Sequence, residues 1–219
     1  MKISPQSRPD LLILISLLAV ILLYPALDHG GLRRLILTAL TFVPIVLATV
    51  RLSQRRSWLW PSVLLMVIAL IFGLASTLFP NPTLLALKWG ALAAFCGFTV
   101  VGLFSYLKSA RSVVREHLYT AISIYLLLGM LWFALYCVID IVSPGSFGRS
   151  GDVRTNHQSE LLYFSLVTLS TVGYGDVVAL QPEARMVAAL EGMAGVLYVA
   201  ITVAILINSF RRQDSSSSE

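Results

Sequence analysis

The stretch Thr171-Val172-Gly173-Tyr174-Gly175 decides the fold, because it directly follows an apolar run that is too short to cross a bilayer. That run, residues 161–170, would be only about 15 Å long as a helix, whereas the hydrocarbon core of a bilayer is about 30 Å thick. Ser159 and Glu160 provide a capping hydroxyl and an acidic first turn, so they predict the start of this helix. We therefore expect a re-entrant helix that enters the membrane and turns back.

The five residues after this helix do not favour a further helical turn. Gly173 and Gly175 stand at alternate positions around the large aromatic Tyr174. Glycine adopts positive φ without steric cost, so alternating glycines allow successive carbonyl oxygens to point one way. Non-helical backbone at membrane depth persists only where protein buries it or where it lines a watery cavity. Carbonyls facing a common axis can replace the water shell of a cation, and several copies of the segment in cyclic symmetry would be needed to enclose that axis.

The composition indicates a membrane protein. Of the 219 residues, 57% are hydrophobic and 12% are charged, and the mean hydropathy is +0.82. About a quarter of the residues of a soluble domain are charged, so bilayer is the natural solvent for this chain. The net charge of +5 does not indicate nucleic-acid binding, because the basic residues lie in short clusters at the ends of apolar runs.

Six apolar runs are long enough, or nearly so, to span a bilayer as helices, which takes about 20 residues each. They cover residues 11–27, 32–50, 58–79, 84–107, 118–142 and 185–210. The first could be a cleaved signal peptide, but no convincing cleavage site follows it. Cys96 and Cys137 lie inside these runs and are interpreted as small buried hydrophobic residues. No histidine pair has metal-ligand spacing, so we expect no metal centre and no cofactor.

The distribution of Lys and Arg favours two cytoplasmic termini in a multi-pass protein of the cell membrane. With this orientation, ten basic residues lie inside and six outside. The inside set is Lys2, Arg8, Arg51, Arg55, Arg56, Lys108, Arg111, Arg115, Arg211 and Arg212, and the outside set is Arg33, Arg34, Lys88, Arg149, Arg154 and Arg185.

The segment from Thr168 to Asp176 resembles the selectivity filter of tetrameric potassium channels, whose filter loops read Thr-Val-Gly-Tyr-Gly. The resemblance covers residues 118–210, with an outer helix, a turret, the re-entrant helix, the filter and an inner helix. The first four spans resemble the family only in number and hydrophobicity. The resemblance implies an all-α homotetramer of six-span subunits around a central pore, in which K⁺ is the permeant ion and identical subunits and the bilayer are the partners.

The resemblance also implies roles for individual residues. The hydroxyl and carbonyl of Thr171 would form the innermost K⁺ site, and the carbonyls of Val172, Gly173 and Tyr174 would form the sites above it. Gly175 and Asp176 would close the outer mouth, and Ser170 would support the filter from below. The negative end of the re-entrant helix dipole would favour cations below the filter.

The chain departs from the family pattern beside the filter. Tyr163 and Phe164 stand where several members have tryptophans, and Tyr163 can donate a hydrogen bond to Asp176. Val167 stands where some bacterial relatives place a glutamate behind the filter. Glu191 lies in the sixth span, where a carboxylate is costly and usually functional or paired. Our hypothesis is that Glu191 hydrogen-bonds to the back of the re-entrant helix and braces the filter; the alternative is a carboxylate that snorkels or faces a water-filled crevice.

The inner helix carries a candidate gating hinge at Gly195, where many such channels place a glycine. Gly192 and Gly195 could equally serve close helix packing. Further along, residues at helical spacing would line a mostly apolar cavity that could gate by dewetting; these are Val199, Thr202, Val203 and Leu206.

The first four spans do not predict a voltage sensor. The fourth run contains Lys88 as its only basic residue, and the second and third runs contain no acidic residue, whereas steep voltage gating needs several charges per subunit. Residues Lys108, Arg111 and Arg115 are better interpreted as an interfacial helix. We expect a four-span peripheral domain (residues 1–117), a pore domain (residues 118–210) and a short disordered cytoplasmic tail (residues 211–219).

The sequence therefore predicts a potassium-selective channel subunit that is not an enzyme and whose gating stimulus is open. The alternatives are a non-selective cation channel, a non-conducting regulatory subunit, and a membrane enzyme that uses Glu191, Asp140 or Asp176. The enzyme lacks a paired nucleophile and base.

Overall fold

The computed structural model describes residues 7–27, 31–52, 56–79, 81–108, 115–149 and 158–216. Within these ranges the chain forms long helices and one pair of short strands. In chain order the elements are α1 (Ser7–Leu27), α2 (Gly31–Leu52), α3 (Arg56–Leu78), α4 (Pro82–Lys108), α5 (Arg115–Val142), β1 (Phe147–Arg149), α6 (Gln158–Leu169), β2 (Val177–Ala179) and α7 (Pro182–Ser216).

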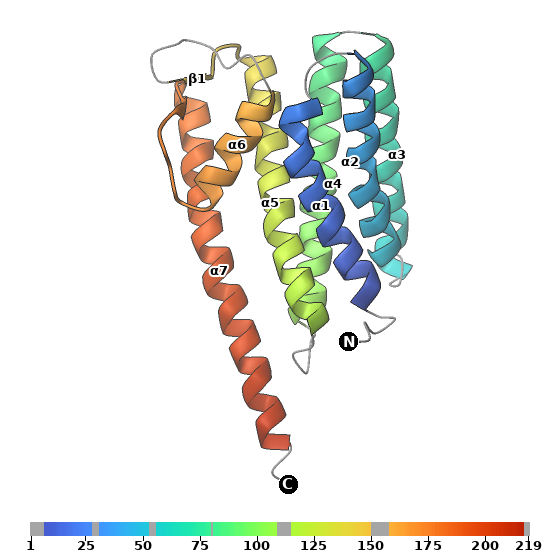
Figure 1. Ribbon diagram of the computed structural model, residues 1–219, viewed down its shortest axis with the longest axis vertical. Coiled ribbons are helices and arrows are strands. Elements are labelled where there is room, and N and C mark those ends of the chain that lie inside the picture. Colours follow the sequence, from blue (N-terminus) through green and yellow to red (C-terminus); the bar gives the residue numbers. More distant parts are fainter. Residues whose placement is uncertain are drawn as a thin grey trace.

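The helices form two groups that lie side by side (Figure 1). Helices α1 to α4 make one bundle, and α5, the short α6 and α7 make the other. Helix α5 is the main link between the groups, because it packs against both α1 and α4. Helix α1 begins and α7 ends at the same end of the structure, where α7 extends beyond the other helices.

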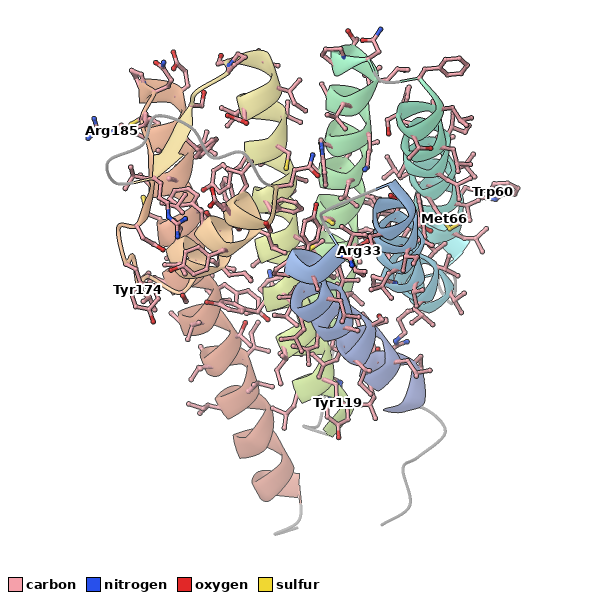
Figure 2. The ribbon with its side chains drawn as sticks, turned by 45° about the horizontal axis from the view of Figure 1, so that its top comes forward. Arg33, Trp60, Met66, Tyr119, Tyr174 and Arg185 are labelled. Atoms are coloured by element: carbon pink, nitrogen blue, oxygen red, sulfur yellow. The ribbon has the colours of Figure 1, made fainter. Side chains whose placement is uncertain are left out.

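Five of the described helices are long and apolar enough to cross a membrane, within α1, α3, α4, α5 and α7. In α2 the apolar part of the described chain is shorter and runs over Ile36–Leu52. The all-α membrane fold predicted from the sequence is confirmed, and α2 remains a prediction as the sixth span. Large apolar side chains on the outside of α3, including Trp60 at 73% exposure (Figure 2), suit a bilayer as the surrounding solvent.

The core lies where α1, α4 and α5 meet. The fully buried Phe133 ring packs edge-on against Tyr24 at 5.3 Å and Trp89 at 5.0 Å between ring centroids. Edge-to-face contacts at these separations are favourable beyond the burial of their area. Helix α1 is therefore an integral part of the packed bundle, contributing Ile13, Leu17 and Val20 to the same core.

One buried ion pair joins the ends of α1 and α2. The Arg51 Nε donates to Asp10 Oδ1 at 2.7 Å, and Asp10 is only 1% exposed. The Arg51 guanidinium also lies 4.3 Å from the centroid of the Tyr106 ring on α4, and this ring stacks on His117 of α5 at 5.5 Å. A cation held by a carboxylate and an aromatic face can remain charged away from water. This cluster joins four helices at the end where α1 begins.

Three features of the fold differ from the sequence-based expectation or lie beyond it. The prediction of a disordered tail from residue 211 onward is wrong as far as residue 216, because α7 continues to Ser216. Arg and Gln are good helix formers, and no Gly or Pro interrupts this part of the helix. Helix α6 starts at Gln158, one residue before the predicted cap. The interfacial helix predicted around Lys108, Arg111 and Arg115 falls largely on residues 109–114, outside the described residues.

Candidate functional site

The re-entrant helix α6 is fastened to α5 by close backbone approach and a hydrogen bond. Ser165 Oγ donates to the Gly129 carbonyl at 2.8 Å. A Cβ on Gly129 would lie 2.9 Å from the Leu166 side chain, so glycine at this position allows α6 to approach. Next to Ser165, Phe164 packs with Tyr136 of α5 at 5.2 Å and with Phe147 of β1 at 5.6 Å between ring centroids. The helix is thus held along its buried face.

The backbone after α6 adopts positive φ at every second residue. The φ angles are 59° at Thr171, 56° at Gly173 and 76° at Gly175. The sequence predicted such alternation from the two glycines, and Thr171 adds a non-glycine residue in the left-handed region. Such a conformation is strained for a β-branched residue and persists only where its surroundings impose it.

The N–H groups of this segment point back to the re-entrant helix. Val167 O accepts from the N–H of Val172 at 3.0 Å and of Gly173 at 3.4 Å, and Thr168 O accepts from the N–H of Thr171 at 2.9 Å. Among the described residues, no group donates a hydrogen bond to the carbonyls of residues 171–175. The segment thus presents a row of unused acceptors, and each of its residues is exposed in the single chain.

The Ser170 hydroxyl, predicted to support the filter, bonds to the helix beneath it. Its Oγ lies 2.8 Å from Leu166 O and 3.2 Å from Val167 O. It therefore closes the last turn of α6, whose carbonyls have no partner within the helix itself.

The outer end of the filter segment is held at two points. Tyr163 OH donates to Asp176 Oδ1 at 3.2 Å, the contact that the sequence suggested. Immediately after Asp176, β2 pairs antiparallel with β1, with Val177 opposite Arg149.

Glu191 lies fully buried at the junction of three helices. Its Oε1 is 2.5 Å from the Ser165 hydroxyl of α6, and its Oε2 accepts a short hydrogen bond from the Tyr136 hydroxyl of α5. Of the two possibilities left open by the sequence, the structure places the carboxyl behind the re-entrant helix, at 0% exposure. Its effect on the filter stays a prediction.

Gly195 lies against the end of the re-entrant helix. A Cβ on Gly195 would overlap the carbonyl oxygen of Leu169, whereas a Cβ on Gly192 would lie 3.8 Å from the nearest backbone oxygen. Close packing thus accounts for the glycine at residue 195, and its use as a hinge is untested.

The four residues predicted to line the pore cavity border one apolar cavity of about 300 Å³. This cavity lies between α7 and α5, since Leu118, Ile122 and Tyr125 line its other wall. Val199 and Val203 are about half exposed, at 51% and 48%. Thr202 is 6% exposed and is therefore packed inside a single subunit, where it cannot line a central pore without rearrangement.

Comparison with known protein families matches residues 120–212 to the family described as Ion channel. This region is therefore similar to the channel-forming region of ion channels. The match runs through α5, the re-entrant helix, the filter segment and most of α7, which are the elements that the sequence assigned to a pore. An ion channel is not an enzyme, so the enzyme alternative is excluded for this region.

Curated relatives of this chain are potassium channels. The mouse and human potassium voltage-gated channel subfamily A member 10 are each 31% identical over 86 residues, which is 38% of this chain and 17% of the relative. The Caenorhabditis elegans potassium voltage-gated channel protein shk-1 is 32% identical over 113 residues, or 51% of this chain and 19% of the relative. The chain thus spans less than a fifth of the length of these relatives. No solved structure matches it.

Two groups of contacts at the site were not predicted. One is the β1–β2 pair, which fixes the chain on both sides of the turret; the sequence indicated only turns at residues 143–148. The other is the pair of hydroxyl partners of Glu191. Ser165 could have been found as a polar residue in the middle of an apolar re-entrant helix, but Tyr136 carries no comparable signal.

Proposed function

We propose that this chain is the subunit of a potassium-selective channel that conducts K⁺ passively. The observation that carries the proposal is the row of hydrogen-bond-free carbonyls at residues 171–175, with positive φ at alternate positions. Unpaired backbone acceptors are expensive to bury, and a dehydrated cation is a partner that would use all of them. The potassium-channel relatives support K⁺ as that cation.

The channel is a homotetramer in this proposal, because one copy of the filter segment covers only one side of an ion. Val172 and Tyr174 are 53% and 72% exposed in the single subunit. Tyr174 lies at the edge of the structure farthest from the peripheral helices (Figure 2), where a neighbouring copy has access. Helix α7 exposes further large apolar residues that neighbours would cover: Met186, Leu190, Met193, Val196, Leu197 and Ile201.

Ion identity is assigned to the filter oxygens, and general cation preference to the helix. The carbonyls of Thr171, Val172, Gly173 and Tyr174 hold successive K⁺ sites. The C-terminus of α6 at Leu169 immediately precedes them, so four helix dipoles place their negative ends near the ion.

In the membrane, both termini lie on the cytoplasmic side of the cell membrane, with six spans per subunit. The ten-to-six distribution of basic residues supports this orientation. So does the position of the start of α1 and the end of α7 at one end of the structure (Figure 1). The peripheral domain of residues 1–117 is not a steep voltage sensor in this proposal. Helix α4 carries only two basic residues, Lys88 and its last residue Lys108, whereas steep voltage gating needs several charges per subunit.

Reconstitution into liposomes tests the proposal. With K⁺ and Na⁺ on opposite sides, the reversal potential should follow the K⁺ gradient, and a voltage ramp should give no steep activation. A reversal potential near zero would indicate the non-selective channel, and absence of any flux from folded protein would indicate the non-conducting subunit. Protein-free liposomes provide the baseline.

A further inference from the structure

Tyr198 joins the inner helix α7 to the outer helix α5. Its hydroxyl donates to the main-chain carbonyl of Ala121 at 2.5 Å, and its ring lies 5.7 Å from the ring of Tyr125. Both partners are on α5, four residues apart, so they lie on the same face of that helix. The side chain therefore bridges two membrane-spanning helices with a polar bond and an aromatic contact at once.

The same ring is also reached from the peripheral bundle. Phe104 of α4 lies 6.4 Å from Tyr198 between ring centroids, and the ammonium of Lys108 lies 5.1 Å from the Phe104 ring. Helix α4 packs along α5, but Phe104 extends its contact to α7. Tyr198 is thus a residue of the inner helix on which the peripheral domain and the outer helix both act.

Beside this bridge, α5 and α7 do not close completely. The apolar cavity of about 300 Å³ lies between them, and Ala121, Tyr198 and Val203 are among its lining residues. The Thr202 hydroxyl on the same wall is buried and has no hydrogen-bond partner among the described residues. The cavity opens to the outside of the single subunit, since Val199 and Val203 on its wall are about half exposed. The contacts of Tyr198 therefore hold α7 against α5 at a place where the two helices pack loosely.

We propose that Tyr198 is a positioning residue that holds the inner helix against α5, so that the ratio of open to closed pores depends on its hydroxyl and on its contact with Phe104. The proposal rests on the proposed channel function. Release of the tether allows α7 to separate from α5, toward the axis that the filter segments share. The released state is therefore the more closed one.

The size of the effect follows from the energy of one interhelical hydrogen bond. Such bonds contribute about 0.6 to 1.7 kcal/mol in membranes, so Tyr198→Phe should lower the open-to-closed ratio about three- to eighteen-fold for each subunit. Phe104→Ala should change the ratio in the same direction. If Phe104 acts through Tyr198, its effect should shrink in the double variant, because residues that share one interaction are not additive.

Single-channel recording of the purified protein in planar bilayers tests this inference. Unitary conductance and reversal potential should stay at wild-type values in Tyr198→Phe, since the filter is untouched, while the open-to-closed ratio falls. Tyr119→Phe removes a hydroxyl from α5 outside this contact and should leave the ratio unchanged. Phe98→Ala removes an α4 ring that packs on Trp58 of α3, at 4.9 Å, and is the control for Phe104→Ala.

Hydrogen exchange in nanodiscs provides a readout that does not depend on conduction. Tyr198→Phe should increase amide hydrogen exchange in residues 199–207 of α7. Tyr119→Phe should leave the exchange of these residues unchanged. If the wild type conducts and Tyr198→Phe leaves the ratio unchanged or raises it, the inference is wrong and the channel function stands. If the wild type is silent, the channel function fails, and unchanged exchange in Tyr198→Phe would overturn the tether itself.

Discussion

Replacing Glu191 tests whether its buried carboxyl braces the filter through hydrogen bonds or only fills space between the helices. In Glu191→Ala the Tyr136 hydroxyl loses its acceptor inside the protein, which costs about 1–3 kcal/mol. Ser165 keeps the Gly129 carbonyl as a partner. The volume left by the missing side-chain atoms adds a cavity cost, so the total destabilisation is about 2–5 kcal/mol per subunit.

Glu191→Gln should behave differently because the hydrogen-bond pattern can be kept. Ser165 has one hydroxyl hydrogen but two acceptors within reach, Gly129 O at 2.8 Å and Glu191 Oε1 at 2.5 Å. A glutamine amide nitrogen at this position can donate to Ser165 Oγ, which releases that hydrogen for Gly129, while the amide oxygen accepts from Tyr136. We expect a loss of about 1 kcal/mol or less.

Thermal unfolding of the purified protein measures the stability difference, and single-channel recording measures the effect on the filter. Glu191→Ala should unfold at lower temperature and show shorter open bursts in K⁺, and Glu191→Gln should lie close to the wild type in both measurements. Glu183→Ala, which removes an exposed carboxyl from the first turn of the same helix, is the matched control. Wild-type bursts and stability in Glu191→Ala would refute the bracing role, and a Glu191→Gln variant as impaired as Glu191→Ala would refute the hydrogen-bond argument.

Three other substitutions test neighbouring parts of the structure. Gly195→Ala should prevent stable folding because its Cβ would overlap the last carbonyl of the re-entrant helix, whereas Gly192→Ala should elute as wild type in size-exclusion chromatography; equal behaviour of the two would contradict the packing argument. Asp10→Asn should lower the free energy of unfolding by about 3–5 kcal/mol, measured by thermal unfolding, because the buried Arg51 guanidinium loses its carboxylate partner. Joint replacement of Asp10 by Leu and Arg51 by Met should recover most of that loss. Gly173→Ala places a side chain at a φ of 56°, at about 1–2 kcal/mol per subunit, and should shift the reversal potential away from that of K⁺; unchanged selectivity would count against the assigned filter geometry.

The parts of the site that follow from local rules could be predicted from the sequence. The length of the apolar run fixed the re-entrant helix, because a helix of 12 residues cannot cross a bilayer whatever surrounds it. The two glycines indicated the alternating backbone, because the freedom of glycine to adopt positive φ is a property of the residue and does not depend on its surroundings. The positive φ of Thr171 could not be predicted in this way, because its neighbours impose it and the residue itself does not favour it.

The parts that depend on contacts between distant residues could not be predicted in the same way. Tyr136 lies 55 residues before Glu191, and only the crossing of α5 and α7 brings the two side chains together. Gly195 had two equally good interpretations until the position of the Leu169 carbonyl distinguished a packing requirement. Thr202 has the helical spacing of a cavity residue, but the direction of α5 places it inside the subunit.

The ion pair between Asp10 and Arg51 has a consequence for how the chain enters the bilayer during synthesis. An unpaired Asp or Arg opposes insertion by a few kcal/mol at the middle of a membrane and by less near its surface, and these two residues lie near the ends of consecutive helices, where they pair with each other. The first two helices therefore favour entering the bilayer together as a hairpin, in which each charge neutralises the other. Tyr106 leaves the ribosome 55 residues after Arg51, so the aromatic face that completes the cluster arrives only when the fourth helix does.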